Sequence, residues 1–352
     1  MNKYKVGIIG CGRMGFLFDE DEKTIKPSSH AGAYKSFKNC DMVAVCDIRT
    51  DRLDLFKKRY GNVNTYYDYN EMLEKEDLDI ISICTPSNLH SDVCIKAANH
   101  VKAIFCEKPI AMSLKEADQM INACKKNNVL LAVDHIRRWD RTYEKIKELI
   151  DDKTYGEVTS IVAYSSPGLM NGGVHIIDVI QHVFGRIQCI SGHIIKDAST
   201  DACGIGYLTV NGIPCLIDAT PKKYMKVGLD IYTTEGVLEN SGITRGEKSL
   251  IFRKGVNSSF ESGVSELIEP FSIDMGVSSP PLINAIENII NTLGGKDTLK
   301  CSGDDGRKAI EVAIAFHLSS YLNGKQIDLP IDTELGIVPR QTSYNEEGRL
   351  DE

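Results

Sequence analysis

Three glycines near the start of this 352-residue chain have the spacing of a phosphate-binding turn. The pattern G-x-G-x-x-G directly follows an apolar run at 4–9 and comprises Gly10, Gly12, Arg13, Met14 and Gly15. Glycines at these positions allow a tight turn, a close approach of the backbone to a pyrophosphate, and close packing of a helix against the preceding strand. The N-terminus of a helix behind the turn attracts anions. We therefore predict that these residues bind a dinucleotide.

An acidic residue after the next apolar run supports this prediction. Asp47 ends the run 42–47, where its carboxylate would accept hydrogen bonds from ribose hydroxyls and repel a 2′-phosphate. NAD is therefore expected rather than NADP, although Arg52 lies nearby and could tolerate a phosphate. Asp47 stands 32 residues after Gly15, whereas the usual spacing is about 20. The segment 18–30 is interpreted as an insertion that explains the difference.

Two further segments carry side chains that could do chemistry. Lys108 lies in Glu107-Lys108-Pro109 at the end of the apolar run 103–109. A lysine cation there would stabilise a developing alkoxide, although a solvated loop lysine is the alternative interpretation. The second segment, around the helical run 174–184, contains Asn171, His175, Asp178 and His182. Residues 175, 178 and 182 would share one helix face, so either histidine could serve as a general base.

The elements that would position these residues alternate regularly in the first part of the chain. Helical segments separate five strand-like runs, at 4–9, 42–47, 79–85, 103–109 and 129–135. Such alternation predicts a parallel, doubly wound α/β sheet, the Rossmann arrangement. The carboxyl ends of its strands, where ligands bind in open sheets, would carry the glycine turn and the lysine.

After Arg138 the pattern changes to one of an antiparallel sheet. A helix near 142–151 and the helical run 174–184 are followed by successive strands over about 189–253. Asn211-Gly212 favours a type I′ hairpin turn among them. Two helices, near 281–293 and 304–323, precede a polar tail at 334–352. We predict a Rossmann domain at 1–134 and an α+β domain at 135–352.

Composition excludes several classes of partner. The formal net charge is −8 and no basic block is present, which argues against nucleic acid as the main partner. No run is long enough to span a membrane. The eleven cysteines are scattered singly, without C-x-x-C or a Cys/His cluster of zinc spacing, so no metal site is expected. Buried, reduced thiols and a cytoplasmic location are the simplest interpretation.

Several segments, in order along nearly the whole chain, resemble one family, the Gfo/Idh/MocA oxidoreductases. The matching segments include GIIGCGRMG, VAVCDIRTDRL, ISICTPSNLH, AIFCEKPIAMSLKEADQMI, YGEV and GGVHIIDVIQHVFG. The resemblance implies a Rossmann domain followed by a domain with a large, open, mostly antiparallel sheet. It also implies a sugar or cyclitol substrate between the two, and a homodimer or homotetramer formed through the outer face of the sheet.

The resemblance further implies roles for individual residues. Lys108, beside Glu107, would contact both the substrate hydroxyl and the nicotinamide ribose. The residues after the third strand would line the cofactor channel; they are Cys84, Thr85, Pro86, Asn88 and His90. The pattern H-x-x-D followed by a glycine selects His175 and Asp178, whereas a literal D-x-x-x-H match selects His182 instead. We favour His175 as the general base.

Four more residues have weaker assignments. Relatives usually carry an aspartate four residues before the histidine, where this chain has Asn171, so the ring would be oriented without an added charge. Arg138 and Trp139 follow the fifth strand and could contact cofactor or substrate, or simply pack there. His135 is expected to be structural.

The leading hypothesis is an NAD-dependent dehydrogenase that oxidises a secondary alcohol of a sugar, cyclitol or sugar derivative. Two alternatives stay open. One is a redox-neutral enzyme in which bound NAD oxidises the sugar transiently, allowing epimerisation or elimination. The other is a non-catalytic NAD-binding partner protein, which Asn171 alone favours.

Overall fold

The computed structural model describes residues 3–22, 24–61, 63–195, 201–221, 226–240, 250–257 and 265–332. These residues form two compact units. Among the described residues, the first contains the chain up to Trp139 and the segment Ser279–Ile310. The second contains the described residues of Asp140–Ser278 and those from Glu311 to Asp332. The predicted division assigned everything after residue 134 to one domain. The first unit instead includes Ser279–Ile310, because Trp139 donates its indole N–H to Asn288 and accepts a hydrogen bond from Asn284 at its carbonyl oxygen.

The first unit is built on a six-stranded parallel sheet in the order β3-β2-β1-β4-β5-β6. The strands are β1 (Tyr4–Ile9), β2 (Cys40–Cys46), β3 (Asn64–Tyr66), β4 (Ile80–Ile83), β5 (Ala103–Cys106) and β6 (Leu130–Val133). Every residue of β4 and β5 is buried, as expected for strands covered on both faces. The order is that of a doubly wound Rossmann sheet, which confirms the predicted fold. β3 is a strand that the sequence analysis did not predict.

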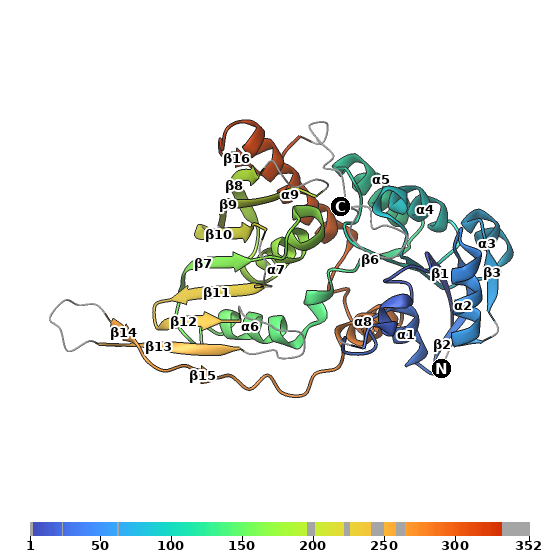
Figure 1. The fold of residues 1–352 in the computed structure, drawn as a ribbon, viewed down its shortest axis with the longest axis horizontal. Coiled ribbons are helices and arrows are strands. Elements are labelled where there is room, and N and C mark those ends of the chain that lie inside the picture. Colours follow the sequence, from blue (N-terminus) through green and yellow to red (C-terminus); the bar gives the residue numbers. More distant parts are fainter. Residues whose placement is uncertain are drawn as a thin grey trace. The chain divides into compact units, whose positions relative to one another are not determined.

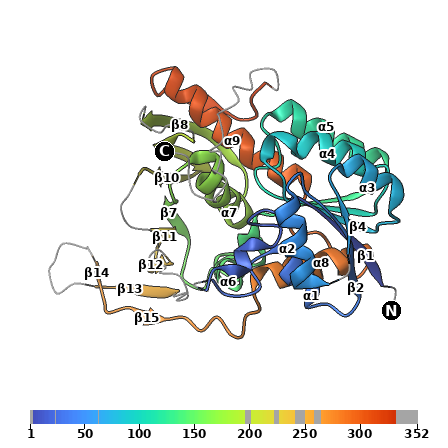
Figure 2. The same ribbon diagram turned by 45° about the vertical axis from the view of Figure 1, so that its right-hand side comes forward.

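Helices cover both faces of this sheet (Figures 1 and 2). α4 (His90–Ala97) packs beside α5 (Leu114–Lys126), and α1 (His30–Lys35) packs beside α8 (Pro281–Leu293). The remaining helices that belong wholly to this unit are α2 (Thr50–Tyr60) and α3 (Tyr69–Lys75). Ser113 caps the N-terminus of α5, because its hydroxyl accepts a hydrogen bond from the backbone N–H of Glu116.

The helix expected directly behind the glycines is interrupted, which corrects the sequence prediction. A single turn and a short 3₁₀ helix at Leu17–Glu20 follow the glycines, and α1 begins only at His30. The N–H groups of His30 and Ala31 nevertheless bond to the carbonyls of Met14 and Gly15. In an uninterrupted helix the N–H groups of residues 18 and 19 would bond to these two carbonyls. Residues 30 and 31 take their places, so the chain contains a 12-residue insertion here. The buried carboxylate of Asp19 closes it by accepting from the backbone N–H of Ser28 and the hydroxyl of Ser29.

The second unit is built on a ten-stranded sheet in which only β7 and β10 run parallel among the neighbours that are described. Its strands are β7 (Val158–Tyr164), β8 (Ile187–Ile195), β9 (Cys203–Val210), β10 (Ile213–Ala219), β11 (Gly228–Thr233), β12 (Gly236–Glu239), β13 (Ile251–Asn257), β14 (Ser265–Leu267), β15 (Phe271–Ser272) and β16 (Ile327–Asp328). Asn211 and Gly212 both have positive φ between β9 and β10, so the predicted type I′ hairpin is present. The predicted, mostly antiparallel sheet is therefore confirmed.

The helices associated with this sheet are α6 (Arg141–Asp151), α7 (Val174–Phe184) and α9 (Gly303–Tyr321). α9 starts in the first unit and ends in the second. Within the described part of the chain, no helix has the length and apolar character needed to cross a membrane. The predicted polar tail at 334–352 lies outside the described residues.

Candidate nucleotide and catalytic sites

The three glycines of the turn after β1 meet three different constraints. Gly10 has φ +98° and lies against the backbone of Cys84, where a Cβ would come within 2.5 Å of the carbonyl oxygen. At Gly15 a Cβ would come within 2.1 Å of the Gly10 carbonyl oxygen, so this position needs a glycine for close packing. At Gly12 the nearest atom to such a Cβ is a guanidinium nitrogen of Arg52, 3.7 Å away. The packing of the protein therefore does not require a glycine at position 12. A glycine there fits a position that a pyrophosphate approaches closely.

Asp47 lies directly after β2 and is hydrogen-bonded to the glycine turn. Its carboxylate accepts from the backbone N–H of Cys11 at 2.7 Å and from that of Arg49 at 2.9 Å. A guanidinium nitrogen of Arg52 lies 3.8 Å from the same carboxylate. Without the 12 inserted residues, Asp47 would stand 20 residues after Gly15, the usual spacing. The carboxylate has lone pairs left for ribose hydroxyls.

The residues after β4 lie beside the turn, but they differ in accessibility. Pro86 and Asn88 are exposed, whereas Cys84 and Thr85 are half-buried. His90 is fully buried, and its ring nitrogens each lie 2.9 Å from a backbone oxygen, one of Thr85 and one of Pro109. Burial lowers its pKa although these carbonyls act in the opposite direction. His90 therefore joins the loop after β4 to the Glu107-Lys108-Pro109 loop, a role that the sequence did not indicate.

Glu107 and Lys108 follow β5 at the carboxyl edge of the sheet. Lys108 is half-buried, and its backbone N–H donates to the Glu107 carboxylate at 3.3 Å. The other oxygen of Glu107 lies 3.1 Å from Nε2 of His30. Burial raises the pKa of Glu107, but the His30 hydrogen bond and charge together with Lys108 lower it overall. Glu107 is thus an ionised, buried carboxylate directly beside the lysine.

Arg138 and Trp139 are held inside the first unit. Trp139 is fully buried, and its indole donates to Asn288. Arg138 donates to the Lys300 carbonyl at 2.7 Å and pairs with Asp305 at 3.3 Å. These contacts favour the packing interpretation that the sequence left open.

In the second unit a π-helical turn at Leu169–Gly173 leads directly into α7. Asn171 lies on this turn and His175 on the first turn of α7, and both are half-buried. Asp201 is buried beside them, and its carboxylate accepts from the backbone N–H groups of Met170 and Asn171 at 2.9 and 2.7 Å. π turns are frequent at functional sites because they widen the helix locally. Asp178 is fully buried on α7, whereas His182 is half-buried.

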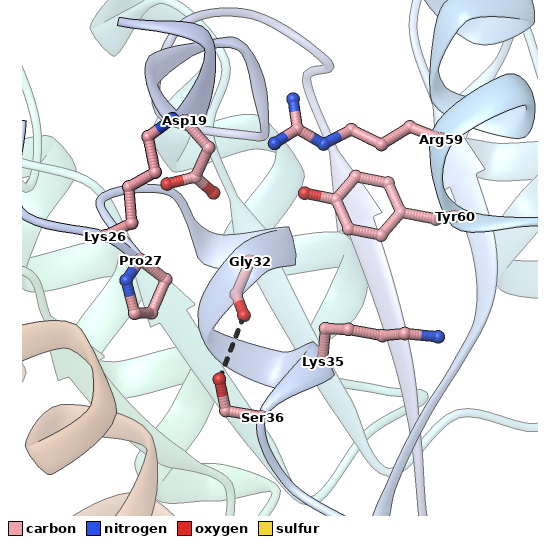
Figure 3. A pocket seen from close by; sticks show the side chains of 8 residues that line it. All are labelled: Asp19, Lys26, Pro27, Gly32, Lys35, Ser36, Arg59 and Tyr60. Atoms are coloured by element: carbon pink, nitrogen blue, oxygen red, sulfur yellow. Dashed lines mark hydrogen bonds between the residues drawn. The ribbon is translucent and has the colours of Figure 1, made fainter. Parts of the chain in front are cut away.

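A surface depression of about 380 Å³ lies elsewhere on the first unit (Figure 3). Its lining residues are Asp19, Lys26, Pro27, Gly32, Lys35, Ser36, Arg59 and Tyr60. None of them is a predicted site residue. The depression is formed by the insertion together with α1 and α2, so it is a product of the interrupted helix.

Sequence reasoning missed the buried groups that support these segments, namely Asp19, His30, Asp134 and Asp201. Asp134 ends the fifth predicted strand, and an acid at the carboxyl end of a strand was a signal that could have found it. His30 lay in the segment regarded as an insertion. Asp201 precedes β9 and carried no motif. All eleven cysteines are free and none is exposed.

Comparison with known proteins shows which family the first part of the chain is similar to. Residues 4–135 match the model of the Gfo/Idh/MocA oxidoreductase family, described as an NAD-binding Rossmann fold. These residues are therefore similar to the Rossmann domain of the Gfo/Idh/MocA oxidoreductases. The matched family model is that of an NAD-binding domain, which agrees with the predicted dinucleotide site. The resemblance inferred from the sequence is thereby confirmed.

Curated relatives match about half of the chain. A myo-inositol 2-dehydrogenase from Thermotoga maritima is 31% identical over 205 residues, which cover 56% of this chain and 58% of the relative. A D-glucoside 3-dehydrogenase from Escherichia coli is 24% identical, covering 57% of this chain and 60% of the relative. The chain thus spans less than two thirds of the length of these relatives.

Solved structures share the fold over almost the whole chain. An oxidoreductase from Desulfitobacterium hafniense, named as NADPH-dependent, has a TM-score of 0.80 at 22% identity and covers 93% of this chain and 98% of its own. The WlbA dehydrogenase from Bordetella pertussis, in complex with NADH and UDP-GlcNAcA, has a TM-score of 0.76 at 18% identity, covering 94% and 99%. At these identities the likeness establishes the two-sheet architecture alone.

Proposed function

We propose that this protein is an NAD-dependent dehydrogenase that oxidises a secondary alcohol of a sugar, cyclitol or sugar derivative. The alcohol carbon loses a hydride to the nicotinamide and its hydroxyl loses a proton, so the products are a ketone, NADH and a proton. The observation that carries the proposal is the glycine turn, which is open at Gly12, bonded to Asp47 and in contact with Cys84 in the loop after β4. His90 joins that loop to the one that holds Lys108.

The residues present fit a bound dinucleotide. The free approach to Gly12 suits a pyrophosphate, and the carboxylate of Asp47 suits the two hydroxyls of a ribose. NAD, when bound, supplies the hydride acceptor. The carboxylate would repel the extra phosphate of NADP, whereas Arg52 would attract it. We therefore propose a preference for NAD that is moderate rather than absolute.

Lys108 is assigned to the substrate hydroxyl. Its ammonium group would stabilise the negative charge that develops on the oxygen as the proton leaves, which is worth most in a site shielded from water. Glu107 beside it is ionised and held by His30. The backbone from which the lysine side chain extends is therefore fixed.

His175 is assigned as the general base, with Asn171 orienting the substrate or the ring. The π turn supports this assignment, since Asp201 fixes the backbone at Asn171 one turn before the histidine. His182 on the same helix is the alternative base, so His182→Ala serves as the comparison variant. The names of the Thermotoga and Escherichia relatives support a cyclitol or a glucoside as substrate.

The test is NADH formation with a panel of inositols, free sugars, glucosides and nucleotide sugars. The proposal expects turnover with at least one member, and a loss of kcat of about 10²-fold or more in both Lys108→Ala and His175→Ala. Wild-type turnover in both variants would reject the assignment. A product isomer without net NADH would instead establish the redox-neutral alternative. Saturable NAD binding without any conversion would favour a non-catalytic partner protein.

A cytoplasmic location and a homodimer or homotetramer complete the proposal. The outer face of the second sheet supports self-association, because it exposes Ile205, Tyr207, Leu216 and Tyr232. The register pairs Tyr207 with Leu216 and Leu216 with Val162, so these side chains share one face. Exposed apolar faces of this kind mark association surfaces.

A further inference from the structure

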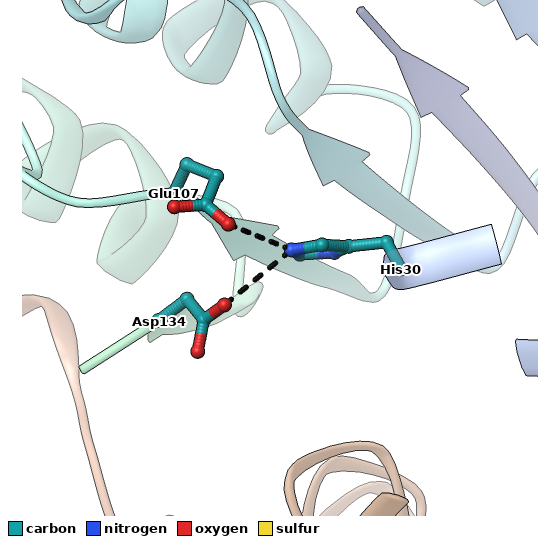
Figure 4. A group of neighbouring side chains, drawn as sticks. All are labelled: His30, Glu107 and Asp134. Carbon is teal, nitrogen blue, oxygen red and sulfur yellow. Dashed lines mark hydrogen bonds and ion pairs between the residues drawn. The ribbon is translucent and has the colours of Figure 1, made fainter. Parts of the chain in front are cut away.

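A buried cluster lies beneath the Glu107-Lys108-Pro109 loop and plays no direct part in the proposed reaction. His30, Glu107 and Asp134 meet there, and all three are buried (Figure 4). Nε2 of His30 lies 3.1 Å from a Glu107 oxygen and 3.5 Å from an Asp134 oxygen. Figure 4 shows the imidazole edge directed between the two carboxylates. The same ring nitrogen therefore lies close to two carboxylates, which follow neighbouring strands.

Four elements fix this arrangement. Glu107 follows β5, Asp134 follows β6, and His30 is the first residue of α1. On its other side the ring is held by Ser82 of β4, whose hydroxyl lies 2.9 Å from Nδ1. Ser82 is in turn 3.0 Å from the Tyr34 hydroxyl, one turn along α1. The imidazole thus has a polar partner at each nitrogen, and its orientation is set by the sheet and the helix together.

The charges of the cluster are consistent with a protonated ring. Burial by itself lowers the pKa of His30, but Cys84, Asp134 and Glu107 raise it well above its ordinary value. Burial and the charge of Glu107 raise the pKa of Asp134 to about 7. The other titratable groups facing the ring are the thiol of Cys84 and the hydroxyl of Tyr34, and burial raises both of their pKa values. These directions favour a protonated ring beside an ionised Glu107, with Asp134 changing its charge near neutral pH.

This cluster connects directly to the lysine. The Glu107 oxygen that does not contact His30 accepts from the backbone N–H of Lys108. The far side of the loop is held separately, since His90 contacts the Pro109 carbonyl. Losing the imidazole would leave Glu107 buried against Asp134 without its main partner, and Glu107 would have to rotate or take up a proton.

We propose that His30 is a positioning residue for Lys108: bridging Glu107 and Asp134, it holds Glu107 where that side chain fixes the lysine backbone. The inference rests on the proposed function, because it takes Lys108 as the group that contacts the substrate. It also gives the interrupted helix a role. The insertion ends where α1 resumes at His30, and this brings the imidazole under the loop.

The test is a double-mutant cycle on the full-length protein with the substrate identified by the panel. His30→Gln keeps a polar side chain without the charge, and His100→Gln, at an exposed histidine of the same unit, is the matched control. His30→Gln is expected to lower kcat/KM at least about tenfold, while the Kd for NAD stays within about twofold. His100→Gln is expected to match the wild type in both.

The cycle separates positioning from mere stability. If His30 acts through Lys108, the variant His30→Gln/Lys108→Ala loses no more activity than Lys108→Ala alone. If the activity loss of the double variant equals the product of the losses of the two single variants, the proposal is overturned. Wild-type activity in Lys108→Ala would instead reject the proposed function, whatever His30→Gln does, so the two failures are distinguishable.

The protonation state of His30 can be measured without relying on enzyme activity, and in the wild-type protein it can be measured even if the variant fails to fold. Nitrogen NMR of ¹⁵N-histidine-labelled wild-type protein is expected to show one imidazole protonated at both nitrogens well above pH 7. That signal must be absent from His30→Gln and present in His100→Gln. A neutral ring for His30, or a stoichiometric metal ion that elemental analysis finds in wild type and not in His30→Gln, would overturn the hydrogen-bonded bridge.

Discussion

At the scale of single residues, the three glycines of the turn after β1 meet different structural requirements. Gly10 has a positive φ, Gly15 permits close packing, and Gly12 has open space that we propose a pyrophosphate uses. The sequence predicted all three from spacing, because the pattern reflects local backbone geometry. His30 and Asp134 escaped prediction because their roles depend on four elements packing together, and no short pattern records that.

The glycines give a matched pair of variants. Gly15→Ala places a methyl group 2.1 Å from the Gly10 carbonyl oxygen, so the turn must deform and the free energy of unfolding should fall by about 1–3 kcal/mol. Gly12→Ala meets only the Arg52 side chain, so stability should change by less than about 0.5 kcal/mol while NAD binding weakens. Urea unfolding and NAD titration measure the two effects. Equal stability losses would contradict the division of roles.

Asp47 should set the preference between the two nicotinamide dinucleotides. Asp47→Asn keeps one acceptor oxygen, which can still accept from the backbone N–H of Cys11 in the turn, and removes the charge that repels a 2′-phosphate. The Kd ratio of NADP to NAD should therefore fall about tenfold or more, with Arg52 supplying attraction. Calorimetric titration with both dinucleotides measures it, and Asp51→Asn, at a carboxylate paired with Arg49 instead, is the control. An unchanged ratio would remove Asp47 from the ribose site.

At the scale of elements, interruptions of regular helices coincide with the candidate sites. The 12-residue insertion splits the first helix and begins α1 at His30, and the π turn before α7 carries Asn171. The sequence predicted the insertion from the displaced acid and predicted α7 over 174–184. It missed the π turn, since the widening depends on Asp201, thirty residues away in the chain.

The π turn should depend on Asp201. Asp201→Ala leaves two backbone N–H groups without their acceptor, so the turn should relax and Asn171 should lose its position. We expect kcat to fall about tenfold or more with little change in the Kd for NAD, because Asp201 and the glycine turn belong to different units. Asp201→Asn, which keeps one acceptor oxygen, should lie between Asp201→Ala and the wild type. Unchanged kcat in Asp201→Ala would show that the turn does not serve catalysis.

At the scale of the whole molecule, the buried cluster should make stability depend on pH. The pKa of Asp134 is about 7 in the folded protein, against about 3.9 in an unfolded chain. Between these values the folded state holds a proton that the unfolded state has released. The contribution of Asp134 to the free energy of unfolding therefore falls as pH rises, by up to about 1.4 kcal/mol per pH unit.

Asp134→Asn tests this contribution. Its stability, measured by urea unfolding at several pH values from about 4.5 to 7, should lack the downward slope that Asp134 gives the wild type. His30, whose pKa is raised, adds a loss of stability only as pH rises above about 6.5. Parallel profiles for variant and wild type would mean that Asp134 is already ionised throughout.

The proposed oligomer is a second prediction at this scale. Leu216→Glu and Tyr207→Glu would place charges on the exposed apolar face of the second sheet. Light scattering should show a smaller assembly for the double variant than for the wild type, because burying an unpaired charge at an interface is costly. Lys153→Glu, at an exposed site in the turn after α6, is the control. A wild-type monomer would refute the prediction.

Both sheets of the molecule could be predicted from the sequence, because alternation of strands with helices and the Asn211-Gly212 turn are local signals. The grouping of Ser279–Ile310 with the first unit could not, since it depends on Trp139 meeting Asn284 and Asn288 across the chain. In the same way, the Rossmann turn and the lysine loop were predictable. The contacts of His30, Asp134 and His90 that hold these segments in place could not be predicted.

The central claim is hydride transfer from an alcohol carbon to NAD, and deuterium labelling tests it most directly. The wild-type protein would be incubated with NAD and each perdeuterated alcohol of the panel, and the dinucleotide analysed by mass spectrometry. We expect NADH that carries deuterium with at least one alcohol, formed about 10²-fold or more slowly when His175→Ala or Lys108→Ala replaces the wild type. NAD recovered unreduced with every alcohol, or NADH without the label, would contradict it.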